Sequence, residues 1–272
     1  IGSLPVRSSY FFALYFIKNG DIIYKVKGKE VTGVDINNVV TEMKGEKGTT
    51  VDITVYRESE KKYIDFTITR DQVNEPTVEY KMLDKKKKIG YIQISQFEEV
   101  TYDQFTKALD DLKKQGMKAV IFDVRSNPGG LYETVCKMLD EILPEGNLVS
   151  TKDKYGNEEK QTSDSKCLEM PMVVLQNKDS ASASEIFAGA IQDFNAGKIV
   201  GTQSFGKGIV QTILPLSDGS AVKLTVQDYY TPSGKNIHGK GITPDVEAEL
   251  EENATSDTQL EKAKETIMEL MK

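Results

Sequence analysis

The chain has 272 residues, of which 38% are hydrophobic and 28% charged, a composition that suits one large globular domain or a large and a small one. Its formal net charge of −7 at pH 7 argues against nucleic acid or anionic lipid as the main partner, because both are themselves negative. No run approaches the roughly 20 apolar residues of a membrane-spanning helix.

Residues 1–16 show no clear period, and we predict no structure for them. The apolar stretch Tyr10–Ile17 is too short to be a complete signal peptide, and it lacks a cleavage signature. From Ile17 onward turn signals and alternating residues predict a small β-rich unit. Its predicted elements are a strand at 22–26, a helix between Asp35 and Gly45, strands at 50–57 and 64–69, and a linker at Asn74-Glu75-Pro76.

The region that follows alternates strand and helix patterns, which predicts an α/β layer arrangement. Lys85-Lys86-Lys87-Lys88 precedes the first strand and is interpreted as a solvated loop. Residues 119–124 (AVIFDV) form a continuous apolar run, typical of a strand buried on both faces. The predicted strands lie at 89–94, 119–124, 172–176, 199–201, 209–216 and 221–228, and the predicted helices at 102–114, 131–143, 182–194 and from Asp257 onward.

Ser182 stands where a buried strand runs through small residues into a helix. The spacing Ser182-x-x-Glu185 forms a capping box, so the simplest interpretation of Ser182 is a helix N-cap. A helix start also presents unpaired backbone N–H groups and the positive end of the helix dipole, which stabilise an oxyanion. Ser182 is therefore also a candidate nucleophile, with the Ala183 N–H as an oxyanion donor.

Lys207 lies between two glycines, with apolar neighbours and no acidic residue within four positions. An amine held in an apolar site is more easily neutral, and a neutral amine can take the proton of a serine hydroxyl. In a strand Gln211 would point to the same face and could orient that amine. A surface lysine in a turn is the alternative interpretation.

The paired glycines Gly129 and Gly130 follow a central strand and could expose a second oxyanion donor, although a plain tight turn explains them equally well. His238, the single histidine, lies in a glycine-rich polar loop that is more typical of a surface side chain than of a catalytic base. Cys136 and Cys167 lack metal-ligand spacing and could pair only if the chain is exported. No metal or nucleotide motif appears, so we expect no metal and no cofactor.

Taken together, four ordered segments resemble the C-terminal processing peptidases, also called tail-specific proteases. The segments are the xRxNxGG-like loop at 125–130, NxxSASASEI at 177–186, FGKGxxQ at 205–211 and YYTPSGxxIxGKGxxPD at 229–245. The resemblance implies a crotonase/ClpP-like layered protease core that cleaves protein substrates through an acyl-enzyme. It assigns Ser182 as nucleophile, Lys207 as general base and Gln211 as the residue that positions the lysine. Ala183 and Gly130, with Gly129 as the other choice, match the oxyanion donors.

The resemblance also implies a domain plan. Residues 17–73 are similar to a PDZ domain whose front part is missing, 77–250 form the protease core and 251–272 a closing amphipathic helix. It implies substrates with accessible C-terminal tails, an extracytoplasmic location and a possible homodimer. Two alternatives remain: a non-catalytic or gated PDZ-containing scaffold, and an acyl transferase acting on a small thioester.

Overall fold

The computed structural model describes residues 17–18, 20–71, 76–250 and 256–272. The predicted segment 1–16 and the linker residues Asn74 and Glu75 lie outside the described residues. The chain divides into two compact units, 1–74 and 75–272, each of which is described by itself. Among the described residues, no helix combines the length and the apolar character that a membrane crossing requires.

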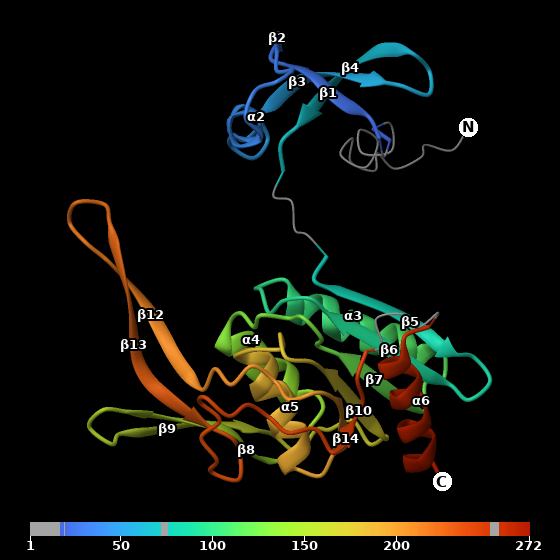
Figure 1. Cartoon of the computed structure of the whole chain (residues 1–272), viewed down its shortest axis with the longest axis vertical. Coiled ribbons are helices and arrows are strands. Elements are labelled where there is room, and N and C mark those ends of the chain that lie inside the picture. The colour runs from blue at the N-terminus through green and yellow to red at the C-terminus, as the bar shows by residue number, and fades with distance from the viewer. Residues whose placement is uncertain (1–16, 19, 72–75, 251–255) are drawn as a thin grey trace, which may run out of the picture. The chain divides into compact units, whose positions relative to one another are not determined.

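The described residues of the first unit form an antiparallel sheet of strand order β2-β1-β3-β4 and one short helix (Figure 1). The predicted strand at 50–57 is confirmed, because Val51, Ile53 and Val55 are buried on one face as the alternation requires. Its elements are β1 (Ile22–Val26), β2 (Lys29–Glu30), α2 (Ile36–Met43), β3 (Thr50–Arg57) and β4 (Lys62–Thr69).

The second unit is built on a six-stranded sheet of order β14-β11-β10-β7-β6-β5. Its strands pair in parallel, except for β5, which is antiparallel to β6. Its strands are β5 (Val78–Asp84), β6 (Ile89–Ile94), β7 (Ala119–Asp123), β10 (Met172–Gln176), β11 (Gly197–Gly201) and β14 (Val246–Glu247). The strands predicted at 89–94, 119–124, 172–176 and 199–201 are confirmed as β6, β7, β10 and β11, whereas sequence analysis did not predict β5 or β14.

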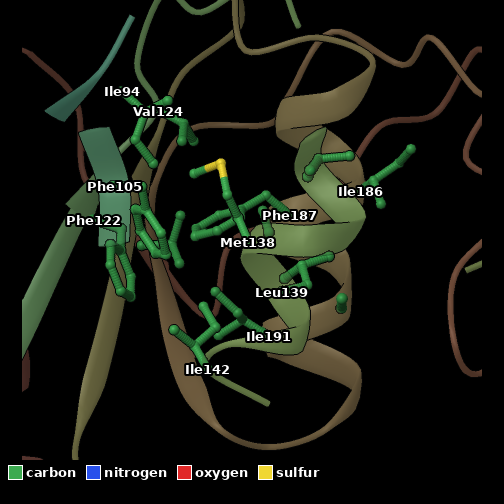
Figure 2. Close-up of a cluster of buried hydrophobic side chains, with 14 of the residues drawn as sticks. Ile94, Phe105, Phe122, Val124, Met138, Leu139, Ile142, Ile186, Phe187 and Ile191 are labelled. Atoms are coloured by element: carbon green, nitrogen blue, oxygen red, sulfur yellow. The ribbon is translucent and has the colours of Figure 1, made fainter. Parts of the chain in front are cut away.

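Helices cover both faces of this sheet, which explains the continuous apolar runs of β7 and β10. Phe122 packs edge-on against Phe187, with 5.4 Å between ring centroids, inside the larger core (Figure 2). The other face of the sheet is covered by Ala263 and Ile267. The helices of the larger core are α3 (Thr101–Lys114), α4 (Tyr132–Asp140) and α5 (Ala183–Asp193), and α6 (Thr258–Leu270) covers the other face.

A second sheet has the order β12-β13-β8-β9 and is antiparallel throughout. Figure 1 shows β12 (Ile209–Pro215) and β13 (Ala221–Tyr230) as a long hairpin extending from the unit. Sequence analysis did not predict β8 (Gly146–Asp153) or β9 (Glu158–Ser163). Five of the six β9 residues are exposed, so β9 carries no apolar period, and its pairing with β8 makes it a strand.

The two cysteines are free thiols: Cys136 is buried in α4 and Cys167 is partly exposed. Burial raises the pKa of the Cys136 thiol to about 12. This thiol therefore stays protonated, and it contributes to the core as a small apolar side chain.

A buried ion pair closes the first unit. Arg57, at the end of β3, donates from Nε and Nη2 to the Asp21 carboxylate at 2.8 and 2.7 Å. The Arg57 hydrogen bonds lower the pKa of Asp21 from 3.8 to about 2. Glu60, which accepts from Lys62, Lys18 and Arg57, also has its pKa lowered to about 2.

The pair makes the stability of the first unit sensitive to acid. Because the folded pKa lies below the unfolded value, the stabilisation is complete above about pH 4 and is lost as the pH falls toward about 2. We expect the urea midpoint of the β1 and β3 amide signals in NMR to fall over that range. Asp21→Asn should reduce this fall, with Glu60 accounting for the remainder, whereas the exposed control Glu58→Gln should leave it unchanged. An undiminished fall in Asp21→Asn would contradict the assignment.

Candidate active site

Two segments of the candidate site meet because β7 and β10 are parallel neighbours, so the loops that follow them leave the same edge of the sheet. Hydrogen bonds join the loops directly. The Ser180 hydroxyl donates to the Val124 carbonyl at 2.8 Å, and the Ala181 N–H donates to the Asn127 carbonyl at 3.0 Å. The sequence segments at 125–130 and 177–186 therefore form one structure.

Ser182 occupies a strained turn at the start of α5. Its backbone has φ +57° and ψ −115°. Holding a non-glycine residue in this conformation costs about 1–3 kcal/mol of conformational free energy, and residues strained in this way cluster at functional sites. Gly129 packs directly against this turn: a Cβ there would lie 2.7 Å from the Ala181 carbonyl oxygen and 2.8 Å from the Ser182 Cβ. The glycine at 129 thus lets the loop approach the serine.

The buried carboxylate of Glu185 connects this turn to the third segment. Oε2 accepts from the Ser182 N–H and the Lys207 N–H, each at 2.8 Å. Oε1 accepts from the Ser204 hydroxyl at 2.6 Å and from the Gly206 N–H at 2.7 Å. The predicted capping contact from Glu185 to Ser182 is present, but the same carboxylate also holds residues 204–207, which sequence analysis did not predict.

Tyr229 of β13 holds the same two segments from another side. Its hydroxyl donates to the Ser182 carbonyl at 3.2 Å, and its N–H donates to the Gly208 carbonyl at 3.0 Å. Burial, and secondarily the charge of Glu185, raise the pKa of Tyr229 well above its usual range. The phenol therefore stays protonated at neutral pH and can act as a hydrogen-bond donor.

The candidate oxyanion donors differ in availability. Within the described residues, the N–H groups of Ala183 and Gly130 donate no hydrogen bond, so both can serve an incoming oxygen. The Gly129 N–H already donates to the buried Asn127 side chain at 2.8 Å. This bond argues against Gly129 as a donor and leaves it the role of fitting against Ser182.

The side chains of Lys207 and Gln211 are less constrained than their backbone. Lys207 is partly exposed, and in the described part of the chain no hydrogen bond joins its amine to the Ser182 hydroxyl. Gln211 is exposed, and its amide donates to the Thr225 hydroxyl at 3.4 Å. Sequence analysis placed Lys207 and Gln211 on one face by assuming a regular strand. The strand β12 begins only at Ile209, and its register shifts between Val210 and Gln211, so this periodicity does not extend to Lys207.

His238 does not enter this arrangement as a side chain. It is exposed, and its backbone packs against Gly208, where a Cβ would lie 2.6 Å from the His238 nitrogen. This agrees with the interpretation of His238 as a surface residue.

Arg125 has a role that sequence analysis did not predict. Its guanidinium donates to Asp123 at 2.6 Å and to Asp257 at 2.7 Å, and Asp257 caps α6 by accepting from the Leu260 N–H. The Tyr91 hydroxyl donates to the same Asp123 carboxylate at 2.7 Å. Arg125 therefore fixes the start of the site loop to the closing helix. In the sequence, the only sign of this ion pair was that Asp123 and Arg125 stand two positions apart.

Comparisons with known proteins agree with this arrangement. A family model described as Peptidase family S41 matches residues 88–248. The chain is 40% identical over 238 residues to "Carboxy-terminal-processing protease" of Bartonella bacilliformis, covering 85% of this chain and 54% of that protein. It is 41% identical over 234 residues to "Probable CtpA-like serine protease" of Staphylococcus aureus, covering 85% and 46%. The chain spans about half the length of these curated relatives.

Among solved structures, the photosystem II D1 C-terminal processing protease is similar, with a TM-score of 0.61 and 30% sequence identity. The likeness covers 93% of this chain and 69% of that one. The predicted α/β layered protease fold is thereby confirmed, while the PDZ-like interpretation of 17–73 stays a prediction.

The Glu185 contacts predict a large stability effect. In Glu185→Gln one oxygen that accepts two hydrogen bonds becomes an NH₂ group facing two donors, so we expect the free energy of unfolding of this unit to fall by about 3 kcal/mol or more. Urea unfolding followed through the β10 amide signals measures it. Glu169→Gln, which changes an exposed carboxylate, is the matched control, and equal midpoints for the two variants would refute the role given to Glu185.

Proposed function

The chain belongs to peptidase family S41, and on that premise we propose that it is a serine endopeptidase of the C-terminal processing type. The observation that carries the proposal is the Glu185 carboxylate, one oxygen of which accepts both the Ser182 and the Lys207 N–H. It supports a Ser-Lys pair, because it holds the backbone of a strained serine beside the backbone of a lysine.

In the proposed reaction the neutral Lys207 amine takes the proton of the Ser182 hydroxyl as Oγ attacks the scissile carbonyl carbon. The resulting oxyanion accepts hydrogen bonds from the Ala183 and Gly130 N–H groups. As the intermediate collapses, the C–N bond breaks, and the Lys207 ammonium protonates the departing amine. Water, deprotonated by the same lysine, then hydrolyses the acyl-enzyme and regenerates Ser182.

The Lys207 side chain must turn toward Ser182 for this reaction, since no hydrogen bond joins them in the described structure. Catalytic hydrogen bonds are often long or absent before substrate binds. We propose that Gln211 leaves Thr225 and orients the amine when substrate is present. A gated or catalytically silent scaffold is the second candidate, and the separation of these side chains is the observation that favours it.

We propose protein substrates with accessible C-terminal tails and an extracytoplasmic location. The PDZ-like unit at 17–73 would bind the tail by adding it as a strand. A homodimer remains a prediction from the sequence.

Substitution of the pair tests the mechanism. Ser182→Ala and Lys207→Ala should each reduce cleavage of an unfolded protein such as denatured casein by about 10⁴-fold or more, because the members of such a pair act as a unit. Lys137→Ala, which changes an exposed lysine on α4, is the control. Labelling of Ser182 by a fluorophosphonate, which reacts with activated serines, separates an active enzyme from a silent scaffold. Full cleavage by both variants would end the proposal.

A second substitution tests the choice of base. Because His238 is exposed and its side chain makes no hydrogen bond to the described site residues, His238→Ala should retain kcat/KM within a few-fold of the unsubstituted chain. Steady-state cleavage of a fluorogenic peptide measures this. A loss in His238→Ala as deep as in Lys207→Ala would transfer the base role to the histidine.

A further inference from the structure

Seven lysines gather on two adjoining loops of the second unit, and we call this surface the lysine edge. Lys85–Lys88 form the turn between β5 and β6, and Lys113, Lys114 and Lys118 lie around the loop between α3 and β7. Two hydrogen bonds hold the loops together: the Lys118 N–H donates to the Lys88 carbonyl at 2.8 Å, and the Lys88 amine donates to the Gln115 carbonyl at 3.1 Å.

The charges of the lysine edge are barely neutralised within the described residues. Its one ion pair joins Lys114 to Asp111 at 3.8 Å, and 77% of the Lys114 side chain is exposed. The Asp84 carboxylate accepts from the backbone N–H groups of Lys86 and Lys87, so it shapes the turn. Like charges on neighbouring positions repel one another. This repulsion between the lysines opposes folding, so the concentration of positive charge favours a role in binding.

The lysine edge and the candidate active site lie at opposite edges of the same sheet. Lys88 and Lys118 directly precede β6 and β7, which are parallel and begin in register, with Ile89 opposite Ala119. The site loops follow the carboxyl ends of β7 and β10. A large partner bound at the lysine edge would thus leave the site accessible.

The chemistry of the lysine edge suits a diffuse anionic surface. All seven cations are lysines, which are flexible point charges, and its loops offer no arginine fork or aromatic face for reading nucleotides. The last turn of α6 lies beside it, because the Lys87 amine contacts the Met268 sulfur. Lys87 also shares a shallow hollow with Glu265, Met268, Glu269, Met271 and Lys272.

We propose that the lysine edge binds the surface of an anionic lipid bilayer. Clusters of four to eight lysines bind anionic headgroups, and each lysine near the surface adds to the attraction. Glu265 and Glu269 weaken the attraction on the α6 side, so the two lysine loops carry it. The net charge of −7, which argued against anionic lipid, is a sum over the whole chain. It does not show that positive charge is concentrated at the lysine edge.

Vesicle binding tests the proposal. The 272-residue chain should sediment with vesicles of equal parts phosphatidylglycerol and phosphatidylcholine at low salt, and should be released at about 0.5 M NaCl, where charges are screened. Phosphatidylcholine vesicles should not retain it. In a variant with Lys85, Lys86, Lys113 and Lys118 all changed to Gln, the partition coefficient should fall by about a hundredfold or more.

The matched control changes the same number of exposed lysines elsewhere in the second unit, namely Lys137, Lys154, Lys160 and Lys223, to Gln. It has the same net charge as the test variant, so it should stay within about threefold of the unsubstituted chain. Equal losses in the two variants would mean that net charge alone acts, and would overturn the proposal. Lysine-dependent binding to a 20-base-pair DNA duplex without vesicle binding would overturn it in favour of nucleic acid.

Discussion

The arrangement of the site depends on one buried carboxylate. Glu185 is charged and fully enclosed, and such a group is tolerated only when hydrogen bonds replace its water. Four donors do so here, and three of them are backbone N–H groups, so satisfying the charge fixes the course of the chain at Ser182, Gly206 and Lys207. The cost of leaving the charge unpaired is what makes the geometry of the site specific.

The strain at Ser182 is held by packing on both sides. Gly129 fits against the turn where no side chain could stand, and Tyr229 binds the Ser182 carbonyl from β13. The first turn of α5 therefore places the Ala183 N–H, which donates no hydrogen bond among the described residues, beside Gly129. Pre-organised donors of this kind stabilise developing negative charge without having to reorient.

The parallel sheet gives the second unit two edges of different character. The carboxyl edge gathers the loops of the candidate site, and the amino edge gathers the lysines. Arg125 joins the site loop to the first turn of α6, and the last turn of α6 reaches the lysine edge. The closing helix therefore contacts both edges while its buried face packs against the sheet.

The elements with strong periods, such as β7 and α3, could be predicted from the sequence alone. The candidate site residues could be nominated in the same way, because Ser182, Lys207 and the glycines stand in short motifs of local geometry. The sequence could not determine β9, whose exposed residues become a strand only by pairing with β8, nor the partners of Glu185 and Arg125. Glu185 looked like a local cap because its links to Ser204, Gly206 and Lys207 join positions about 20 residues apart. Tertiary structure alone decided which donors surround a buried charge, since that depends on which distant segments the sheet brings to the same edge.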